Sequence, residues 1–242
     1  MEQMQTEQTL VCRELSKSYL RGRPILQNLN ITLRPGRVVG LLGPNGCGKS
    51  TLLKLICGIL VPDSGEITVC GEPQSEATNR FISYLPERTY FDGHMVVTGL
   101  MDYFADFYDD FDRTRAEDML RDLGVDMTAR LRTLSKGTKE KVQLVLVMAR
   151  RARLYLLDEP IGGVDPAARD YILNTIIGQY DKNATVLITT HLIHDVEPAL
   201  DEFAFMANGG RILLAGNAEQ TRAERGKSLD ELFREVFACL PN

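Results

Sequence analysis

Residues 43–51 combine glycines, one lysine and two hydroxyl side chains in an order suited to phosphate binding. Their first eight positions match G-x-x-x-x-G-K-[ST], in which the three glycines would turn with positive φ and aim backbone N–H groups at phosphate oxygens. Lys49 would reach the β- and γ-phosphates, and Ser50 would present its hydroxyl to Mg2+. The alternative is a coincidental glycine-rich turn, expected about once in a hundred chains of this length. The candidate nucleotide-binding residues are Gly43, Pro44, Asn45, Gly46, Cys47, Gly48, Lys49, Ser50 and Thr51.

Asp158 and Glu159 follow an apolar run at 154–157 that is typical of a buried strand. Such a strand would deliver Asp158 beside the phosphate loop, where its carboxylate could hold Mg2+ through Ser50 or water. Glu159 would point to the other side of the chain, which suits a base or a water-orienting group for attack on the γ-phosphate. Taken alone, the pair is equally consistent with a solvated strand end. Its combination with the phosphate loop favours catalysis.

The elements that position these residues follow from hydrophobic patterning. Val38–Leu42 is apolar or glycine throughout, which predicts a central strand buried on both faces, and residues 49–59 are expected as the helix after the loop. Alternation in the first part predicts antiparallel strands with one apolar face, formed by Val11, Leu15, Leu29, Ile31 and Leu33. Other strands are expected at 67–69, 81–85, 154–157, 185–188, 203–206 and 211–214, and helical segments at 95–149, 166–177 and 229–239.

Composition limits the class of protein. The chain has 242 residues, of which 44% are hydrophobic and 25% charged, as in ordinary globular proteins. A net charge of −5 argues against a general nucleic-acid binder, which carries a basic face. No apolar run approaches the ~20 residues of a membrane span, and the first residues predict no secretory signal. The five cysteines form no C-x-x-C pair and are expected to be reduced cytosolic thiols.

Further motifs follow in a fixed order. Residues 134–138 read Leu-Ser-Lys-Gly-Thr, residues 162–165 read Gly-Gly-Val-Asp, and residues 189–191 read Thr-Thr-His. Together with the phosphate loop and the strand that ends in Asp158, this order resembles the ATP-binding subunit of an ABC transporter. The resemblance extends from about Thr9 to Gly216 and implies ATP hydrolysis with Mg2+ as cofactor.

The resemblance also implies roles for single residues. Tyr19 stands where the family stacks an aromatic ring on adenine, and His191 stands where a switch histidine contacts the γ-phosphate beside the catalytic Glu159. Asp165 lies in the loop that follows that glutamate. Two such domains would pair head to tail, each covering the ATP of the other with a signature loop. The signature-loop residues are Ser135, Lys136 and Gly137.

Partners are implied in the same way. They are a second ATP-binding subunit, identical or related, and integral membrane permease subunits that this chain lacks, while no nucleic acid is expected. The chain would lie in the cytoplasm, peripheral on the inner face of the cell membrane. One alternative is a soluble ABC-type ATPase acting on ribosomes or DNA, although such relatives usually carry two domains or long coiled coils. Another is an ATP-gated binding module with weak turnover, which the presence of Glu159 disfavours.

Three positions depart from the family pattern. Glu87 replaces the usual glutamine after the strand at 81–85, and its carboxylate could contact Mg2+ or water. Lys136 replaces glycine in the signature loop, where it is expected to be solvated, the alternative being a charge near the partner's γ-phosphate. Thr138 replaces glutamine. These variants most resemble short export-type (ABC-2-like) subunits, so export is the expected direction.

The expected fold is α/β, with a P-loop NTPase (RecA-like) core, an antiparallel β subdomain and an inserted α-helical subdomain. The whole chain, 1–242, would form a single ATP-binding domain. Its core would occupy about 9–90 and 150–216, the helical insertion about 91–149, and a C-terminal extension 217–242.

Two further segments allow alternatives. Residues 102–111 alternate aromatic and acidic side chains; the aromatics would either pack inside the insertion or line a groove for a cytoplasmic helix of the membrane partner. They share helical spacing and are Phe104, Phe107, Tyr108 and Phe111. The basic run 150–153 is expected to be a solvated helix end.

Overall fold

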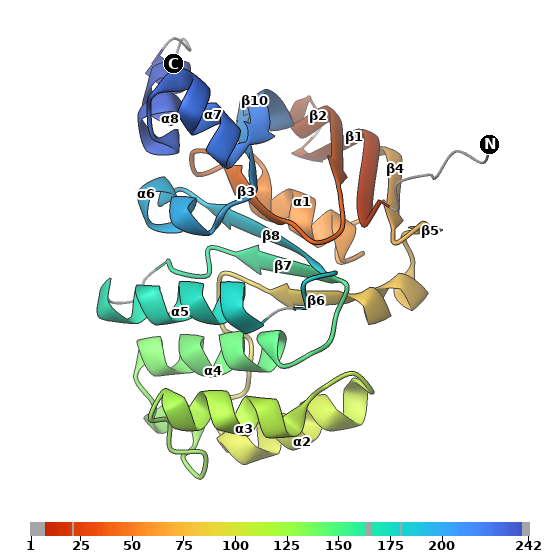
Figure 1. Cartoon of the computed structure of the whole chain (residues 1–242). Helices are drawn as coiled ribbons and strands as arrows, with labels where there is room; N and C mark the ends of the chain where they lie inside the picture. Colours follow the sequence, from red (N-terminus) through yellow and green to blue (C-terminus); the bar gives the residue numbers. More distant parts are fainter. Residues whose placement is uncertain (1–7, 21, 163–165, 180, 239–242) are drawn as a thin grey trace, which may run out of the picture.

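The computed structural model describes residues 8–20, 22–162, 166–179 and 181–238. Their strands form a six-stranded sheet of order β10-β9-β3-β8-β7-β6 and a four-stranded sheet of order β2-β1-β4-β5 (Figure 1). The strands are β1 (Leu10–Leu20), β2 (Arg23–Leu33), β3 (Val38–Leu42), β4 (Ser64–Val69), β5 (Glu72–Pro73), β6 (Ile82–Leu85), β7 (Leu154–Asp158), β8 (Thr185–Thr190), β9 (Glu202–Ala207) and β10 (Arg211–Asn217).

The six-stranded sheet is parallel except for β10, which pairs antiparallel with β9. All five residues of β3 are buried, which confirms the prediction of a strand covered on both faces. The register aligns Asp158 of β7 with Thr189 of β8, and Thr190 with Leu42 of β3. The carboxyl ends of these strands therefore meet at one edge, where the phosphate loop also begins.

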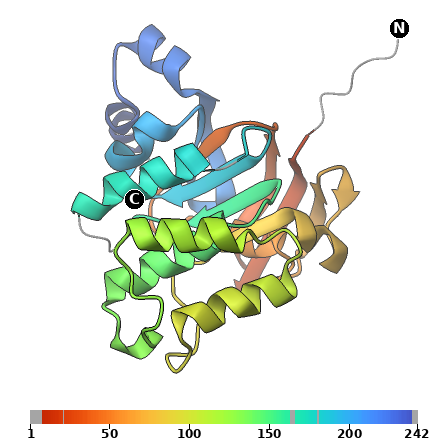
Figure 2. The ribbon, with the colours of Figure 1, turned by 60° about the horizontal axis from the view of Figure 1, so that its bottom comes forward.

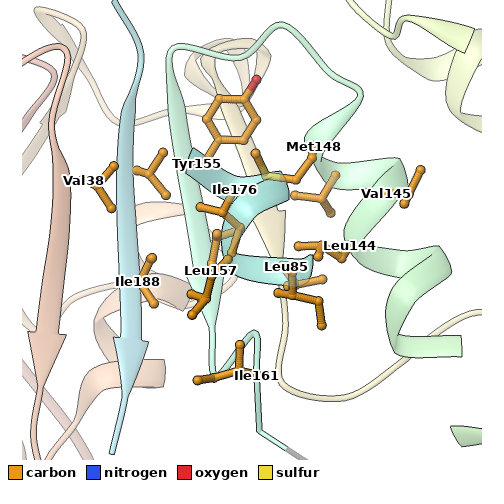
Figure 3. Packing of buried hydrophobic residues seen from close by; sticks show 14 of the residues in the cluster. Val38, Leu85, Leu144, Val145, Met148, Tyr155, Leu157, Ile161, Ile176 and Ile188 are labelled. Carbon is orange, nitrogen blue, oxygen red and sulfur yellow. The ribbon is translucent and has the colours of Figure 1, made fainter. Parts of the chain in front are cut away.

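Alternate residues of the central strands enter two different cores. Leu154 and Leu156 pack with α1 (Lys49–Ile56) and the four-stranded sheet, whereas Tyr155 and Leu157 pack with the helices on the other face. Figure 1 shows α1 between the two sheets. Figure 3 shows Tyr155 and Leu157 among side chains of α4 and its neighbours. This alternation also decides which face each side chain at the end of a strand occupies.

Local backbone turns change two of the expected elements. The helix predicted for 49–59 ends at Ile56 because Gly58 adopts φ 71° and the N–H of Ile59 returns to the carbonyl of Lys54 (2.9 Å). The antiparallel pairing of β1 and β2 is confirmed, but Val11 is only half-buried. The register shifts between Cys12 and Leu15, so the buried side chains of β1 pass from even-numbered to odd-numbered positions. Val11 precedes the shift and therefore lies outside the apolar face that contains Leu15.

The segment predicted to be helical at 95–149 contains three α-helices. Figure 2 shows them gathered as one group, coloured yellow to green. Phe104 is buried but Phe107 is 66% exposed, so the two rings do not share one buried face.

The α-helices that follow α1 in the described residues begin with the three of this segment, α2 (Val97–Phe107), α3 (Arg113–Asp122) and α4 (Lys136–Met148). After them come α5 (Pro166–Gln179), α6 (Ile193–Val196), α7 (Ala218–Arg225) and α8 (Leu229–Ala238). Short 3-10 turns are η1 (Glu76–Phe81), η2 (Leu131–Thr133), η3 (Glu197–Ala199) and η4 (Asn208–Gly210).

The expectation for the basic run 150–153 is wrong at its first residue. Arg150 is only 3% exposed, because Asp110 and the carbonyls of Arg80 and Ile82 accept hydrogen bonds from its guanidinium. Arg151 is exposed, as expected, and pairs with Asp112. The acidic segment before α3 therefore anchors the insertion to the sheet rather than lying only in solvent.

The C-terminal elements pack on the core. The hairpin predicted around Asn208 is confirmed as β9 and β10, and α7 is an addition to the expected elements. The ring of Phe233 in α8 meets that of Phe205 in β9 at 5.3 Å. Glu197 accepts a hydrogen bond from the N–H of Leu229 (2.9 Å), so the start of α8 is tied to η3. Of the helices that the structure describes, none combines the length and apolar character of a membrane span.

Candidate functional site

The phosphate loop joins β3 to α1, and its glycines serve different purposes. Gly46 and Gly48 have φ of 84° and 110°, conformations that side chains with a Cβ rarely adopt. Gly43 lies outside this region of φ, contrary to expectation. Its lack of a side chain is required by close packing, since a Cβ there would collide with the carbonyl oxygen of Met206 and lie 2.9 Å from Sγ of Cys47.

Lys49 begins α1 and is only 6% exposed. Its Nζ donates to the carbonyl oxygens of Gly43 (2.7 Å) and Pro44 (3.1 Å) and lies 4.0 Å from Oε1 of Glu159. The ammonium is thus held over the loop that presents its N–H groups to a ligand. A phosphate in this loop would meet both a positive charge and the amino end of a helix.

Ser50 and Asp158 meet across the two elements that carry them. Oγ of Ser50 donates to Oδ1 of Asp158 at 3.0 Å, and Thr189 donates to the same oxygen at 2.6 Å. Burial raises the pKa of Asp158, while these two hydrogen bonds act in the opposite direction.

A hydroxyl and a carboxylate side by side fit Mg2+, which is held in proteins by few side chains together with phosphate oxygens and water. The described residues contain no cluster of three or more His, Cys, Asp or Glu that would form a metal site without nucleotide. The donor set therefore fits a nucleotide-bound Mg2+, with Ser50 and Asp158 as the protein's contribution.

Glu159 follows β7 with a backbone conformation that costs energy. Its φ is 50°, and its N–H is fixed by the carbonyl of Thr189 (2.9 Å). The two carboxylate oxygens have different partners: Oε2 accepts from Oγ1 of Thr190 (2.9 Å), and Oε1 lies 2.9 Å from Nδ1 of His191. The arrangement aims the carboxylate toward Lys49 and the phosphate loop.

These side chains surround one hollow of about 440 Å3. Tyr19 stands at its rim, 58% exposed, with its hydroxyl 3.2 Å from Oγ1 of Thr51. The exposed ring is available for stacking on a flat ligand. The described residues that line the hollow are Tyr19, Ile25, Asn45, Gly46, Gly48, Lys49, Ser50, Thr51, Glu87, Glu159 and His191.

Comparison with known proteins decides the family. A family model described as "ABC transporter" matches residues 26–162, more than half of the chain. The chain belongs to the ABC transporter family. It is an ABC ATP-binding protein and hence a member of a family of ATPases.

Curated relatives agree. The ABC transporter ATP-binding protein YtrB of Bacillus subtilis (strain 168) is 33% identical over 197 residues, which are 80% of this chain and 67% of YtrB. The ABC-type transporter ATP-binding protein EcsA of the same organism is 30% identical and covers 94% of this chain and 96% of its own length. The chain spans 64% of a third relative, the uncharacterised ABC transporter ATP-binding protein sll0415 of Synechocystis sp..

Solved structures have the same fold. An ATP-binding subunit of an ABC transporter superposes with a TM-score of 0.85 at 29% identity, over 95% of this chain and 99% of that one. The structure of cbiO1 from Clostridium perfringens, described as part of the ABC transporter complex cbiONQ, gives 0.74 at 28% identity, over 97% and 96%. The predicted fold, a P-loop NTPase core with an antiparallel sheet and helices, is therefore confirmed.

The residues predicted to form the signature loop lie at the start of α4. Ser135 caps the helix by accepting from the N–H of Thr138 (3.1 Å), and Lys136 is 82% exposed, with Nζ 3.8 Å from Oε1 of Glu140. Ser135 and Gly137 do not line the 440 Å3 hollow among the described residues, so within one chain they stand apart from the phosphate loop. Asp165 lies outside the described residues.

A second hollow, of about 760 Å3, adjoins the first and is lined by the start of α4 and by residues that follow β6 and β7. Glu87, Glu159 and His191 line both hollows, so Glu87 lies between the phosphate loop and the start of α4. Oε2 of Glu140 is buried there without a hydrogen-bond partner among the described residues, and burial raises the pKa of this carboxyl. Glu140 was not among the predicted site residues.

The sequence-based search also missed Thr189 and Thr190. Both hydroxyls contact carboxylates of the site, although only His191 of that motif was assigned a role. Parallel pairing of the two apolar strands offers the missing signal, because it would place residues after one strand beside residues after the other.

Proposed function

We propose that this chain binds ATP with Mg2+ and hydrolyses it as the ATP-binding subunit of an ABC transporter whose membrane subunits are separate chains. One observation carries the proposal: Lys49, Glu159 and His191 line the hollow beside the phosphate loop. Asp158 is joined to this hollow through Ser50, which also lines it. The chain would act in the cytoplasm, at the inner face of the membrane.

Each side chain has a chemical task in this proposal. Tyr19 stacks on adenine, and Lys49 with the loop N–H groups binds the β- and γ-phosphates. Ser50 and Asp158 hold Mg2+, with Glu87 near enough to contact it or its water; the ion would neutralise charge that develops on the phosphates. Glu159 orients the attacking water or accepts its proton, and His191 contacts the γ-phosphate while it fixes one oxygen of Glu159.

The site of one chain is completed by a second ATP-binding subunit. Ser135 and the N–H of Gly137 begin a 13-residue helix, so they present donors and a positive helix end to an anion outside their own chain. A head-to-tail pair would place them on the γ-phosphate bound by the partner.

A groove beside the helical insertion supports docking to a membrane subunit. Its volume is about 720 Å3, and it lies between β6, the end of α1 and the end of α2. Exposed apolar side chains rim it: Ile59, Tyr90 and Phe107. Two buried polar atoms on residues of its lining, Oδ1 of Asn79 and the hydroxyl of Tyr84, have no hydrogen-bond partner among the described residues. A cytoplasmic helix of the permease would cover the exposed side chains at the rim.

We propose export as the direction, on the likeness of the signature loop to short export-type subunits. Relatives include both the lipopolysaccharide export protein LptB of Haemophilus influenzae and the zinc import protein ZnuC of Pseudomonas fluorescens. The integral membrane protein that co-purifies with this chain from membranes, and the movement of its cargo in vesicles, test the direction. Association with ribosomes or DNA instead would support the soluble alternative.

Glu159→Gln tests the catalytic assignment. The variant should bind ATP with Mg2+, fail to release phosphate and accumulate as an ATP-bound dimer in size-exclusion chromatography. Lys49→Ala is the matched control and should lose ATP binding as well as turnover. Unchanged phosphate release by Glu159→Gln would remove this residue from catalysis, and failure of the wild-type chain to bind ATP would end the proposal.

A further inference from the structure

Two adjacent carboxylates and two adjacent threonines face each other at the ends of β7 and β8. The parallel register aligns Asp158 with Thr189. Because successive side chains alternate between the faces of a sheet, Asp158 and Thr189 lie on the side of α1, whereas Thr190 lies on the side of the helical insertion with Glu159. Thr189 donates to Asp158 at 2.6 Å, and Thr190 donates to Glu159 at 2.9 Å.

The hydroxyl of Thr190 has a single proton, and its direction is determined by its neighbours. Oγ1 accepts a hydrogen bond from the N–H of Leu192 (3.0 Å), which occupies a lone pair. The side chain is completely buried, so water does not compete for the proton. A hydroxyl offers one donor and two lone pairs, and the proton of Thr190 is therefore given to Oε2 of Glu159.

This contact gives the two oxygens of Glu159 different neighbours. Oε2 is held by Thr190, and Oε1 remains beside His191 (2.9 Å) and Lys49 (4.0 Å), on the side of the phosphate loop. The backbone of Glu159, with φ of 50°, is strained and so depends on its surroundings to stay in place. The same threonine oxygen also fixes the N–H of Leu192, the residue directly after His191.

We propose that Thr190 is a positioning residue for ATP hydrolysis: its hydroxyl holds the Glu159 carboxylate in the orientation that serves the attacking water and ties it to the backbone that carries His191. The inference rests on the proposed function, in which Glu159 acts on that water. A hydrogen bond to a charged group is worth about a 10- to 100-fold change in an equilibrium constant. A misplacement of a reacting group by about 1 Å lowers a rate by about 100-fold.

Thr190→Val keeps the shape of the side chain and removes the hydroxyl. In this purified chain we expect kcat for ATP to fall about 10- to 100-fold, with KM for ATP within about twofold, because the phosphate loop is untouched. Thr190→Ser restores the hydroxyl and should return kcat to within about threefold of wild type. A threonine with only a structural role would not lower kcat while leaving KM unchanged, and serine at this position would not then restore kcat.

Thr185→Val is the matched control on the same strand. Thr185 is also completely buried, and its hydroxyl bonds to Thr9 (2.9 Å) and to the carbonyl of Arg34 (2.8 Å), at the opposite end of β8. Thermal melting should show a comparable loss of stability for both valine variants, while Thr185→Val keeps its kcat. A similar fall of kcat in both would assign the effect to the strand and overturn the proposal.

The positioning role of Thr190 and the catalytic role of Glu159 can be tested separately. A folded Thr190→Val with kcat within about twofold of wild type, beside an inactive Glu159→Gln, would overturn the positioning role and leave Glu159 in place. An active Glu159→Gln would instead remove the basis for both. Failure of Thr190→Ser to recover turnover would also count against the hydroxyl.

Discussion

Arg150 and Asp110 join the helical insertion to the parallel sheet through a two-oxygen ion pair. Nε lies 2.9 Å from Oδ1 and Nη2 lies 3.1 Å from Oδ2. The same guanidinium donates to the carbonyl of Ile82 (2.5 Å), in β6, and lies over the ring of Tyr108 at 3.8 Å. One buried cation thus connects the segment after α2 with the strand that leads to Glu87.

Removal of Asp110 should therefore destabilise the fold. Asp110→Ala leaves Arg150 buried with two unpaired donors, and we expect a loss of about 2–3 kcal/mol in the free energy of unfolding. Arg151→Ala, next in sequence, is the control: its side chain is 72% exposed, so the loss should stay below about 0.5 kcal/mol. Urea titration measures both. Equal small losses would show that the Arg150 pair is no stronger than the surface pair.

The aromatic residues of α2 should divide into two phenotypes. Phe104 is buried, so Phe104→Ala should cost about 3–5 kcal/mol and impair folding. Phe107 is exposed beside the groove, so Phe107→Ala should keep the melting temperature and basal ATP hydrolysis while it weakens co-purification with the membrane subunit. Undiminished co-purification by a folded Phe107→Ala would exclude this ring from docking.

Cys47 should react slowly with alkylating agents, but modification should abolish ATP binding. Burial raises the pKa of its thiol, the charge of Lys49 opposing this, so little reactive thiolate is present. Its Sγ packs against Gly43 within the phosphate loop, and added bulk would displace the loop. Mass spectrometry identifies the modified fraction, whose ATP binding is then measured. Cys47→Ala should bind ATP before and after treatment; full binding by protein modified at Cys47 would contradict the prediction.

The core fold could be predicted because the sequence patterns that specify it are each contained in one short segment. A fully apolar β3, the phosphate loop and the helix after it are contiguous in sequence, and so are β7 and its two acids. These segments carry Lys49, Ser50, Asp158 and Glu159, which the structure brings to one edge of the sheet. Hydrophobic periodicity is enough to place such residues at the ends of buried strands.

Other features depend on contacts between distant segments. The burial of Arg150 requires Asp110 and the carbonyl of Ile82, which no pattern within residues 150–153 reveals. The requirement for glycine at position 43 comes from Met206 in β9. The exclusion of Val11 from the apolar face depends on a register shift, which breaks the period of two on which the expectation was based.

Glu140 offers a test of pH-dependent stability. Burial raises the pKa of its carboxyl in the folded protein, so the folded state favours the protonated form. The resulting cost is absent well below the ordinary value of 4.5 and is fully present once the pH exceeds the raised folded pKa. Glu140→Gln should therefore raise the melting temperature by about 1–3 °C at pH 7.5 and have little effect at pH 4. A gain that is equal at both pH values would show that charge is not its cause.

Lys136, the unusual residue of the signature loop, should be dispensable for turnover. Its side chain is 82% exposed and, among the described residues, reaches only Glu140, at 3.8 Å, a contact that contributes little in solvent. Lys136→Gly restores the residue that the family usually has, so kcat for ATP should remain within about threefold and ATP affinity should not change. Phosphate release by the purified chain measures kcat. Because the loop is proposed to cover ATP held by the partner subunit, complete loss of turnover with intact nucleotide affinity would instead assign the ammonium a direct contact with that γ-phosphate.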